Sequence, residues 1–298
     1  MLTRRRFLSV VAATSVAGVA ASFAPVRTNW TGRAMGAEVS ICVGAAGRAA
    51  EVALNAARDT IQRMESLFSL YDPSSALSRL NREGKLVMPA EFVRLVGIAD
   101  RIHGLSGGLF DPTVQPLFTA LATSAQLPSF NLIGWKKVEI EGRTIRLGKR
   151  GMALTFNGIA QGFATDRVSE VLKAHGFDRV LVNIGEYRVG SSPMSIGIAD
   201  HDGKLLAQAE LHDLAVATSS PLALRLGDKR AHILSPKGAQ QSPYWKTVSV
   251  VAPHAAEADG FSTALALTAD RGLARRLIRQ KHVERVFLEG PDGEHRWV

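Results

Sequence analysis

The sequence has a single cysteine, Cys42, among its 298 residues. An intramolecular disulfide and a metal site built from cysteine thiolates are therefore excluded. The alternating pattern of residues 38–43 predicts a strand, on which Cys42 is expected to be a small buried apolar filler. The chain also lacks a Gly-Lys-Ser/Thr sequence, so no P-loop is present. A nucleophilic triad is not indicated, because no cysteine and no second histidine is well placed for one.

Long apolar runs are missing after residue 23, so no membrane span is expected in the mature chain. Residues 3–8 read Thr-Arg-Arg-Arg-Phe-Leu and resemble a twin-arginine export signal. A charged segment followed by a short apolar stretch is typical of a signal peptide. We therefore predict a signal at residues 1–24, cleaved near Ala20, Ala21 or Ala24, and a periplasmic domain at residues 25–298. An uncleaved membrane anchor is the alternative.

Basic residues exceed acidic ones, but they are scattered along the chain. The formal net charge is +9, and removal of the three signal arginines lowers it to +6. No basic stripe interleaved with aromatic residues is present, so nucleic acid is not an expected partner. A modest positive field would instead favour an anionic dinucleotide or an acidic protein partner.

Helical and strand patterns are interleaved, and hairpin-like strands dominate the second half of the sequence. This arrangement predicts an α+β fold with mainly antiparallel sheets and flanking helices. Helices are predicted at residues 49–67, 75–81, 89–103, 112–122, 160–174, 262–268 and 273–281. Strands are predicted at residues 38–43, 135–140, 144–147, 153–156, 179–184, 194–199, 205–211, 213–218, 247–251 and 283–288.

Asp259 and Thr263 are four residues apart, at what the pattern predicts to be a helix start. They would project from one face of that helix. A carboxylate and a hydroxyl are hard oxygen ligands of the kind that Mg²⁺ prefers. Asp, Ser and Thr also favour helix starts as capping residues, so an N-cap is the competing interpretation.

A predicted strand, turn and helix follow one another at residues 153–166. Gly158 and Gly162 would let the backbone approach a ligand closely, and the helix start offers free N–H groups to an anion. A carbonyl in this turn, such as that of Ala160, is a candidate metal ligand. A plain glycine turn with Asp166 on a solvated face is the alternative.

Three further segments carry candidate residues. The glycine loop at residues 107–113 could admit a ligand, or Asp111 could simply cap a helix with Pro112 at its first position. His232 lies between apolar residues and is either a structural histidine or a general base. Ser219 lies in a serine-rich turn that could bind phosphate.

The order of these segments resembles the ApbE family of FAD:protein FMN transferases, from Met35-Gly36 to residues 258–264. The resemblance implies a T-fold-related α+β domain. It also implies Mg²⁺-dependent transfer of FMN from FAD to a threonine of a partner protein, through a phosphoester bond, with release of AMP.

The resemblance also implies roles for individual residues. Ala160, through its carbonyl, matches the metal site together with Asp259 and Thr263. His232 matches the histidine that would activate the acceptor threonine. The positions that line FAD are matched by Met35, Tyr71, Leu109, Phe110, Asp111, Asn157, Phe163 and Ile233.

Several positions depart from the family pattern. Ala37 replaces the threonine of Met-Gly-Thr, and Gln161 replaces the lysine of Ala-Lys-Gly. Glu186 stands in a turn that is usually Gly-Gly-Asp, and Ser235 replaces the acid of His-x-x-Asp-Pro. The Gly-Glu turn suggests members that serve nitrous-oxide respiration, whose acceptor would be a membrane-bound respiratory subunit. The departures also leave two alternatives: a flavin-binding accessory protein without activity, and a Mg²⁺-dependent FAD pyrophosphatase.

Overall fold

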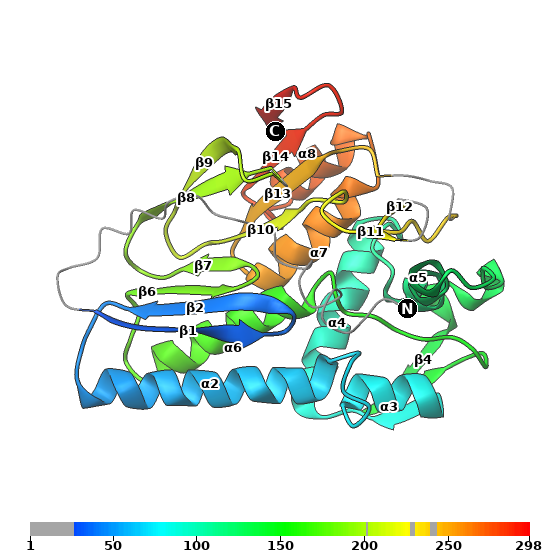
Figure 1. The fold of residues 1–298 in the computed structure, drawn as a ribbon, viewed down its shortest axis with the longest axis horizontal. Coiled ribbons are helices and arrows are strands. Elements are labelled where there is room, and N and C mark those ends of the chain that lie inside the picture. Colours follow the sequence, from blue (N-terminus) through cyan, green and yellow to red (C-terminus); the bar gives the residue numbers. More distant parts are fainter. Residues whose placement is uncertain (1–26, 201, 227–229, 239–242) are drawn as a thin grey trace.

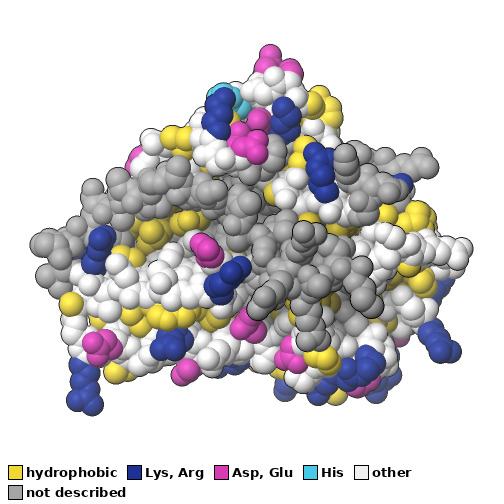
Figure 2. Space-filling view, in the orientation of Figure 1, with side chains coloured by type: hydrophobic (Ala, Val, Ile, Leu, Met, Phe, Trp, Pro, Cys, Tyr) yellow, Lys and Arg dark blue, Asp and Glu magenta, His cyan; other side chains and the backbone are white. Residues whose placement is uncertain are grey.

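The structure is a computed structural model that describes residues 27–200, 202–226, 230–238 and 243–298. The predicted signal at residues 1–24 lies outside the described residues. Within the described part of the chain, no helix is long and apolar enough to cross a bilayer. Basic and acidic side chains are interspersed over the face of the molecule seen in Figure 2.

An eight-stranded antiparallel sheet forms the centre of the molecule, which confirms the predicted α+β class (Figure 1). The strand order is β1-β2-β6-β7-β10-β13-β14-β15. The bounds are β1 Thr28–Ala34, β2 Ala37–Val43, β6 Val180–Ile184, β7 Tyr187–Val189, β10 Ala215–Ser219, β13 Thr247–Ala252, β14 Arg285–Glu289 and β15 His295–Trp297.

Alternation along the strands gives the sheet two buried faces. In β6, Val182 and Ile184 pack into the main core, whereas Leu181 belongs to a second core on the other face. The main core is covered by helices: α2 Arg48–Phe68, α6 Ala160–Ala174, α7 Ala255–Ala266 and α8 Arg271–Arg279. The second face is covered by the hairpin of β8 Met194–Ala199 and β9 Leu205–Leu211. Because both faces are covered, apolar residues occupy both sides of the central strands.

A smaller layer lies beside the main sheet, on the right in Figure 1, and contributes loops to the site. Its helices are α3 Ala76–Glu83, α4 Ala90–Leu105 and α5 Gln115–Thr123, with 3₁₀ turns η1 Pro112–Val114, η2 Phe130–Leu132 and η3 Trp135–Lys137. Its sheet has the order β3-β5-β4, with β3 Lys85–Val87, β4 Val138–Glu141 and β5 Thr144–Leu147. A short two-stranded pair, β11 Arg225–Leu226 and β12 Arg230–Ala231, precedes His232.

Some predicted elements are wrong. The strand predicted at residues 153–156 does not form, because its backbone groups bond elsewhere. Leu154 exchanges two hydrogen bonds with the Asn81 side chain, at 2.7 and 2.9 Å, and the Thr155 N–H donates to the carbonyl of Pro112 at 2.8 Å. Strand β1 was not predicted, and the residues 135–137 form a 3₁₀ turn rather than a strand.

The helix predicted to start at Ser262 begins seven residues earlier, at Ala255. Its own N-cap, His254, makes no side-chain capping bond. Asp259 and Thr263 therefore lie within α7 rather than at its start, and the N-cap interpretation of Asp259 is wrong.

Candidate active site

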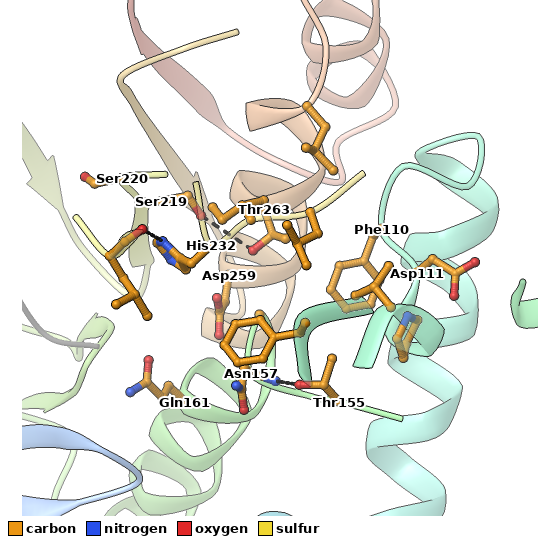
Figure 3. Close-up of a pocket in the computed structure, with 18 of the residues that line it drawn as sticks. Phe110, Asp111, Thr155, Asn157, Gln161, Ser219, Ser220, His232, Asp259 and Thr263 are labelled. Atoms are coloured by element: carbon orange, nitrogen blue, oxygen red, sulfur yellow. Dashed lines mark hydrogen bonds between the residues drawn. The ribbon is translucent and has the colours of Figure 1, made fainter. Parts of the chain in front are cut away.

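Two adjoining cavities lie at the start of α6. The first is bounded by α7 and loops of the smaller layer, and the second by the β1–β2 turn, the end of α2 and the loop that follows α2. The first has a volume of about 160 Å³ and the second about 310 Å³. Tyr71, Asn157 and Gln161 line both, so these three side chains stand at the boundary. The first cavity, shown in Figure 3, is lined by Phe110, Ser219, His232, Asp259 and Thr263 among others, and the second by Met35, Glu65 and Ala160 among others.

Helices α6 and α7 approach each other so closely that one residue must be glycine. A Cβ on Gly162 would lie 2.3 Å from the carbonyl oxygen of Ala255. The neighbour of Gly162 is thus the backbone of α7, which corrects the expectation that it admits a ligand. Gly158 is less crowded, since a Cβ there would lie 2.8 Å from a side-chain atom, the Oγ1 of Thr263. The glycines of this turn bring two helices together at the cavity wall.

Asp259 and Thr263 face the first cavity from successive turns of α7 (Figure 3). One oxygen of Asp259, Oδ2, accepts a hydrogen bond from the N–H of Gly162 at 3.2 Å. The hydroxyl of Thr263 lies 3.5 Å from that of Ser219, which in turn is 2.8 Å from the hydroxyl of Ser262. The end of β10 and the middle of α7 therefore present a row of oxygens to one cavity.

Burial changes the acidity of two carboxyl groups at this wall. Burial raises the pKa of Asp259 to about 7; the Gly162 N–H opposes this shift and the charge of Asp166 adds to it. The pKa of Glu186 is raised well above its usual range by burial and by the charge of Asp259, against a hydrogen bond from the Thr218 N–H at 3.1 Å. Two buried acids in one cavity repel each other when both are ionised. A cation placed between them would remove this cost.

The oxygens here suit a magnesium ion. Ala160 is the first residue of α6 and lines the second cavity, and its carbonyl joins the carboxylate of Asp259 and the hydroxyl of Thr263 as candidate ligands. All three are hard oxygen donors, which Mg²⁺ prefers, and it usually keeps waters and substrate phosphates as further ligands. Among the described residues, no group of three or more His, Cys, Asp or Glu side chains could hold a metal, so a site made only of such side chains is not indicated there.

His232 is a neutral base in this geometry. Its Nδ1 lies 3.0 Å from the carbonyl oxygen of Pro221 and 3.2 Å from that of Leu224. Carbonyl oxygens only accept, so Nδ1 carries the proton and Nε2 keeps the lone pair. Burial lowers the pKa of His232, and the two carbonyl contacts oppose the shift without reversing it. A neutral imidazole with a free Nε2, in the same cavity as Asp259, can accept a proton.

The tip of the β1–β2 hairpin is held over the second cavity by two side chains. The Met35 N–H donates to Glu65 Oε1 at 2.9 Å, and the Gln161 Nε2 donates to the Met35 carbonyl at 3.0 Å. Met35 itself has a φ of 53°, which a non-glycine residue adopts only at some cost. Glu65 and Gln161, from α2 and α6, therefore fix the conformation of this tip.

A model of the ApbE family matches residues 35–287, which include every residue described at the two cavities. The chain belongs to the ApbE family. Similar sequences include the FAD:protein FMN transferase of Chlamydia pneumoniae, 26% identical over 255 residues that cover 76% of this chain and 80% of that protein. The FAD:protein FMN transferase of Klebsiella pneumoniae is 24% identical and covers 92% of this chain and 87% of its own.

Solved structures of ApbE proteins have the same fold. The apo form of the flavinyl transferase ApbE from Pseudomonas stutzeri is 26% identical, with a TM-score of 0.76, and the match covers 91% of this chain and 93% of that one. The ApbE protein from Thermotoga maritima, at 22% identity and a TM-score of 0.80, covers 91% of this chain and 96% of its own and shows the fold alone.

Asp111, which the ApbE resemblance implies lines FAD, does line the first cavity, and its carboxylate is hydrogen-bonded within the protein. Oδ1 accepts from the N–H and the hydroxyl of Thr113, at 2.9 and 2.6 Å, and Oδ2 accepts from the Trp135 N–H at 3.1 Å. Asp111 is thus the N-cap of η1 with Pro112 at its first position, as the alternative interpretation predicted. Figure 3 shows its carboxylate turned away from Asn157 and Asp259. It shapes the cavity by holding the Phe110 loop.

Most of the other residues assigned from the ApbE resemblance meet at the cavities. Tyr71, Leu109, Phe110, Asn157, Ser219 and Ile233 line the first cavity, and Met35 lines the second. Phe163 lines neither; it is 1% exposed and packs edge-on against Phe68 in the core. Its place is behind the wall formed by α6.

Among the cavity residues that were not assigned to the site from the sequence are Glu65, Gln161 and Glu186. Gln161 and Glu186 stood out only as departures from the ApbE pattern. Each is a polar residue next to a glycine in the sequence, and each is only 7% exposed in the structure. Glu65 gave no signal, since it lies within an amphipathic helix where an acid is ordinary.

Proposed function

We propose that this ApbE-family protein is an FAD:protein FMN transferase, which moves FMN from FAD to a threonine of an acceptor protein and releases AMP. The observation that carries the proposal is that oxygen ligands and a neutral base open into one cavity. Asp259 and Thr263 come from α7 and His232 from the segment after β12, and all three line the first cavity. The family match over residues 35–287 supports the same activity.

Magnesium would be held by the Ala160 carbonyl, the Asp259 carboxylate and the Thr263 hydroxyl. When bound, the ion supplies positive charge that offsets the charge of a diphosphate and of the departing AMP. The protein's own part is to present these oxygens from two helices in fixed contact. Ser219, beside Thr263, offers a hydroxyl donor to a phosphate oxygen.

His232 takes the acceptor's proton in the proposed reaction. The threonine hydroxyl gives its proton to Nε2, and its oxygen forms a bond to the phosphorus of the FMN half. The bond from that phosphorus to the bridging oxygen breaks, and AMP leaves with the bridging oxygen. The Pro221 and Leu224 carbonyls hold the imidazole in the tautomer that this step needs.

Export and the identity of the acceptor stay predictions. The twin-arginine sequence supports a periplasmic protein, and the Gly185-Glu186 turn motivates an acceptor in the nitrous-oxide respiratory system. We infer an acceptor domain that carries a threonine among small residues, on a membrane-bound respiratory subunit.

The direct test is to incubate the mature protein with FAD, Mg²⁺ and such an acceptor domain, and to measure flavin that stays on the acceptor after acid denaturation. We expect labelling with the wild type and loss of about 10²-fold or more of the rate with Asp259→Ala, since one electrostatic contact at a reacting centre commonly contributes that much. Asp270→Asn is the matched control, because Asp270 is an acid that caps α8.

Two outcomes would replace the proposal. FAD that copurifies but is neither cut nor moved would indicate a flavin-binding accessory protein. Free FMN and AMP formed without any acceptor would indicate a pyrophosphatase in which water takes the place of threonine. An acceptor whose threonine is changed to alanine should stay unlabelled, and label on it would contradict the proposed bond.

A further inference from the structure

Helices α6 and α7 cap each other's first turns with acids. Neither helix has a side-chain cap at its own N-cap position. Instead, Asp259 of α7 accepts from the Gly162 N–H of α6 at 3.2 Å. Asp166 of α6 accepts from the N–H groups of Ala255 and Ala256, at 2.8 and 3.0 Å. Each carboxylate thus satisfies backbone donors that the other helix leaves free at its start.

The Asp166 end of this exchange is buried and held from a third element. Asp166 is 8% exposed. Arg188 of β7 places its Nη1 3.8 Å from Asp166 Oδ1 and donates a hydrogen bond to the carbonyl of Pro253, just before α7. Strand, helix and helix are therefore joined at one point, next to the place where Gly162 meets Ala255.

We propose that Asp166 is a positioning residue that sets the register between α6 and α7, and with it the spacing of the Ala160, Asp259 and Thr263 oxygens. This inference rests on the proposed metal-dependent function of those oxygens. Asp166 lines neither cavity, so it acts through the helices rather than on a ligand. A shift of α7 along α6 would move Asp259 and Thr263 together but leave Ala160 behind.

The structure contains a matched comparison for the cap. Asp270 accepts from the Gly272 N–H at 2.7 Å and so caps the start of α8. Asp270 follows α7 in the sequence and lines neither cavity. Asp270→Asn keeps the one acceptor oxygen that its cap uses. Asp166→Asn replaces one of two acceptor oxygens with an NH₂ donor that faces a backbone N–H, so only this change should disturb the oxygen set.

The experiment compares Asp166→Asn, Asp270→Asn and the wild type in two measurements. The first is hydrogen exchange of the backbone amides of residues 255–262 in protein free of flavin and metal. We expect faster exchange there in Asp166→Asn and unchanged exchange in Asp270→Asn. The second is the Mg²⁺ concentration that gives half the maximal transfer rate. Partners that orient metal ligands commonly contribute 10–100-fold in affinity, so we expect a rise of about tenfold in Asp166→Asn.

The split between the two kinetic quantities separates positioning from general stability. We expect the rate of Asp166→Asn at saturating Mg²⁺ to fall by less than about threefold, because the ligands themselves are intact. An unchanged Mg²⁺ requirement, with exchange at residues 255–262 like that of the wild type, would overturn the proposal. Should Asp166→Asn fail to fold, Arg188→Lys removes the Pro253 tether more gently, and the same two outcomes decide.

Failure of the proposed function is distinguishable from failure of this inference. The exchange measurement uses neither flavin nor acceptor. Even if the wild type had no transfer activity, comparing its exchange rates at residues 255–262 with those of Asp166→Asn would still show whether Asp166 caps α7. A wild type that transfers flavin, together with an Asp166→Asn variant that keeps both its exchange rates and its Mg²⁺ requirement, would overturn the cap alone.

Discussion

The wall of the cavities made by α6 and α7 differs from the walls made by the hairpin tip and the loops. The helical wall is held by backbone contact at Gly162 and by carboxylates on backbone N–H groups. The tip at Met35 and the loop at Phe110 are held by a few side-chain bonds, from Glu65, Gln161 and Ser106. The oxygens for chemistry thus lie on the rigid wall, and the apolar side chains for a ring system lie on the adjustable ones. Four changes test this division.

The largest expected effect is that of His232→Asn. Asparagine can keep a contact to the carbonyls of Pro221 and Leu224 but has no basic nitrogen, so transfer should slow by about 10²–10⁴-fold. Flavin binding should be unchanged. The measurement is the single-turnover rate from pH 5 to 9: in the wild type the rate should rise with pH up to a His232 pKa below its usual value, and in the variant this step should be absent. A variant that retains the step would contradict the role of His232 as base.

The second effect is on stability and comes from the buried acid. The folded pKa of Asp259 is about 7, above its ordinary value of 3.8, so the metal-free folded protein holds a proton there that the unfolded chain releases. The contribution of Asp259 to the free energy of unfolding therefore falls, by up to about 4 kcal/mol, as pH rises from about 4 to about 7. Denaturant unfolding of metal-free protein at pH 5.5 and pH 8 measures this.

Asp259→Asn is the matched variant, since it keeps the shape and removes the titration. Its free energy of unfolding should lose less between pH 5.5 and pH 8 than that of the wild type. Mg²⁺ with FAD should recover stability at pH 8 in the wild type only. If the free energy of unfolding of the two proteins changes equally with pH, Asp259 is not the buried acid that causes the loss of stability.

The third change, Gly162→Ala, tests whether the helical wall is as rigid as its contacts indicate. The added Cβ would meet the backbone of Ala255, which cannot turn aside as a side chain can. We expect a loss of about 1–3 kcal/mol in the free energy of unfolding and a rise in the Mg²⁺ concentration that gives half the maximal transfer rate. Gly176→Ala is the control, because a Cβ there would meet no atom within 4 Å and the change carries only the cost of the positive φ at Gly176.

The smallest effect concerns the adjustable wall. Glu65→Ala removes the acceptor for the Met35 N–H and should raise the KM for FAD about fivefold, which corresponds to about 1 kcal/mol, with little change in kcat. Glu65→Gln keeps an oxygen in place and should restore the wild-type KM. If the two variants behave alike, the hydrogen bond to Met35 does not fix the tip.

The sequence predicted the class of the fold and most helices and strands, because their apolar periodicity is local. It missed the start of α7, since residues 255–258 carry no local capping signal and the cap comes from Asp166, about ninety residues earlier. It predicted a strand at residues 153–156, where a distant side chain, Asn81, takes the backbone bonds. Both errors have one cause: a partner far away in the chain.

The candidate site followed the same rule. Asp259, Thr263 and His232 could be named from their neighbours and from the family resemblance, and they do share a cavity. Asp111 could not be separated from a capping residue until its carboxylate was seen to bond Thr113 and Trp135. Glu186 was noticed only as an exception, because its burial depends on strands that pair long after it in the sequence.

The boundary made by Tyr71, Asn157 and Gln161 has a consequence for what leaves the enzyme. A molecule that fills both cavities contacts the protein at both of its ends. Once it is cleaved, each fragment keeps only the contacts of its own cavity. We therefore expect an intact molecule that spans both cavities to bind more tightly than either of its fragments.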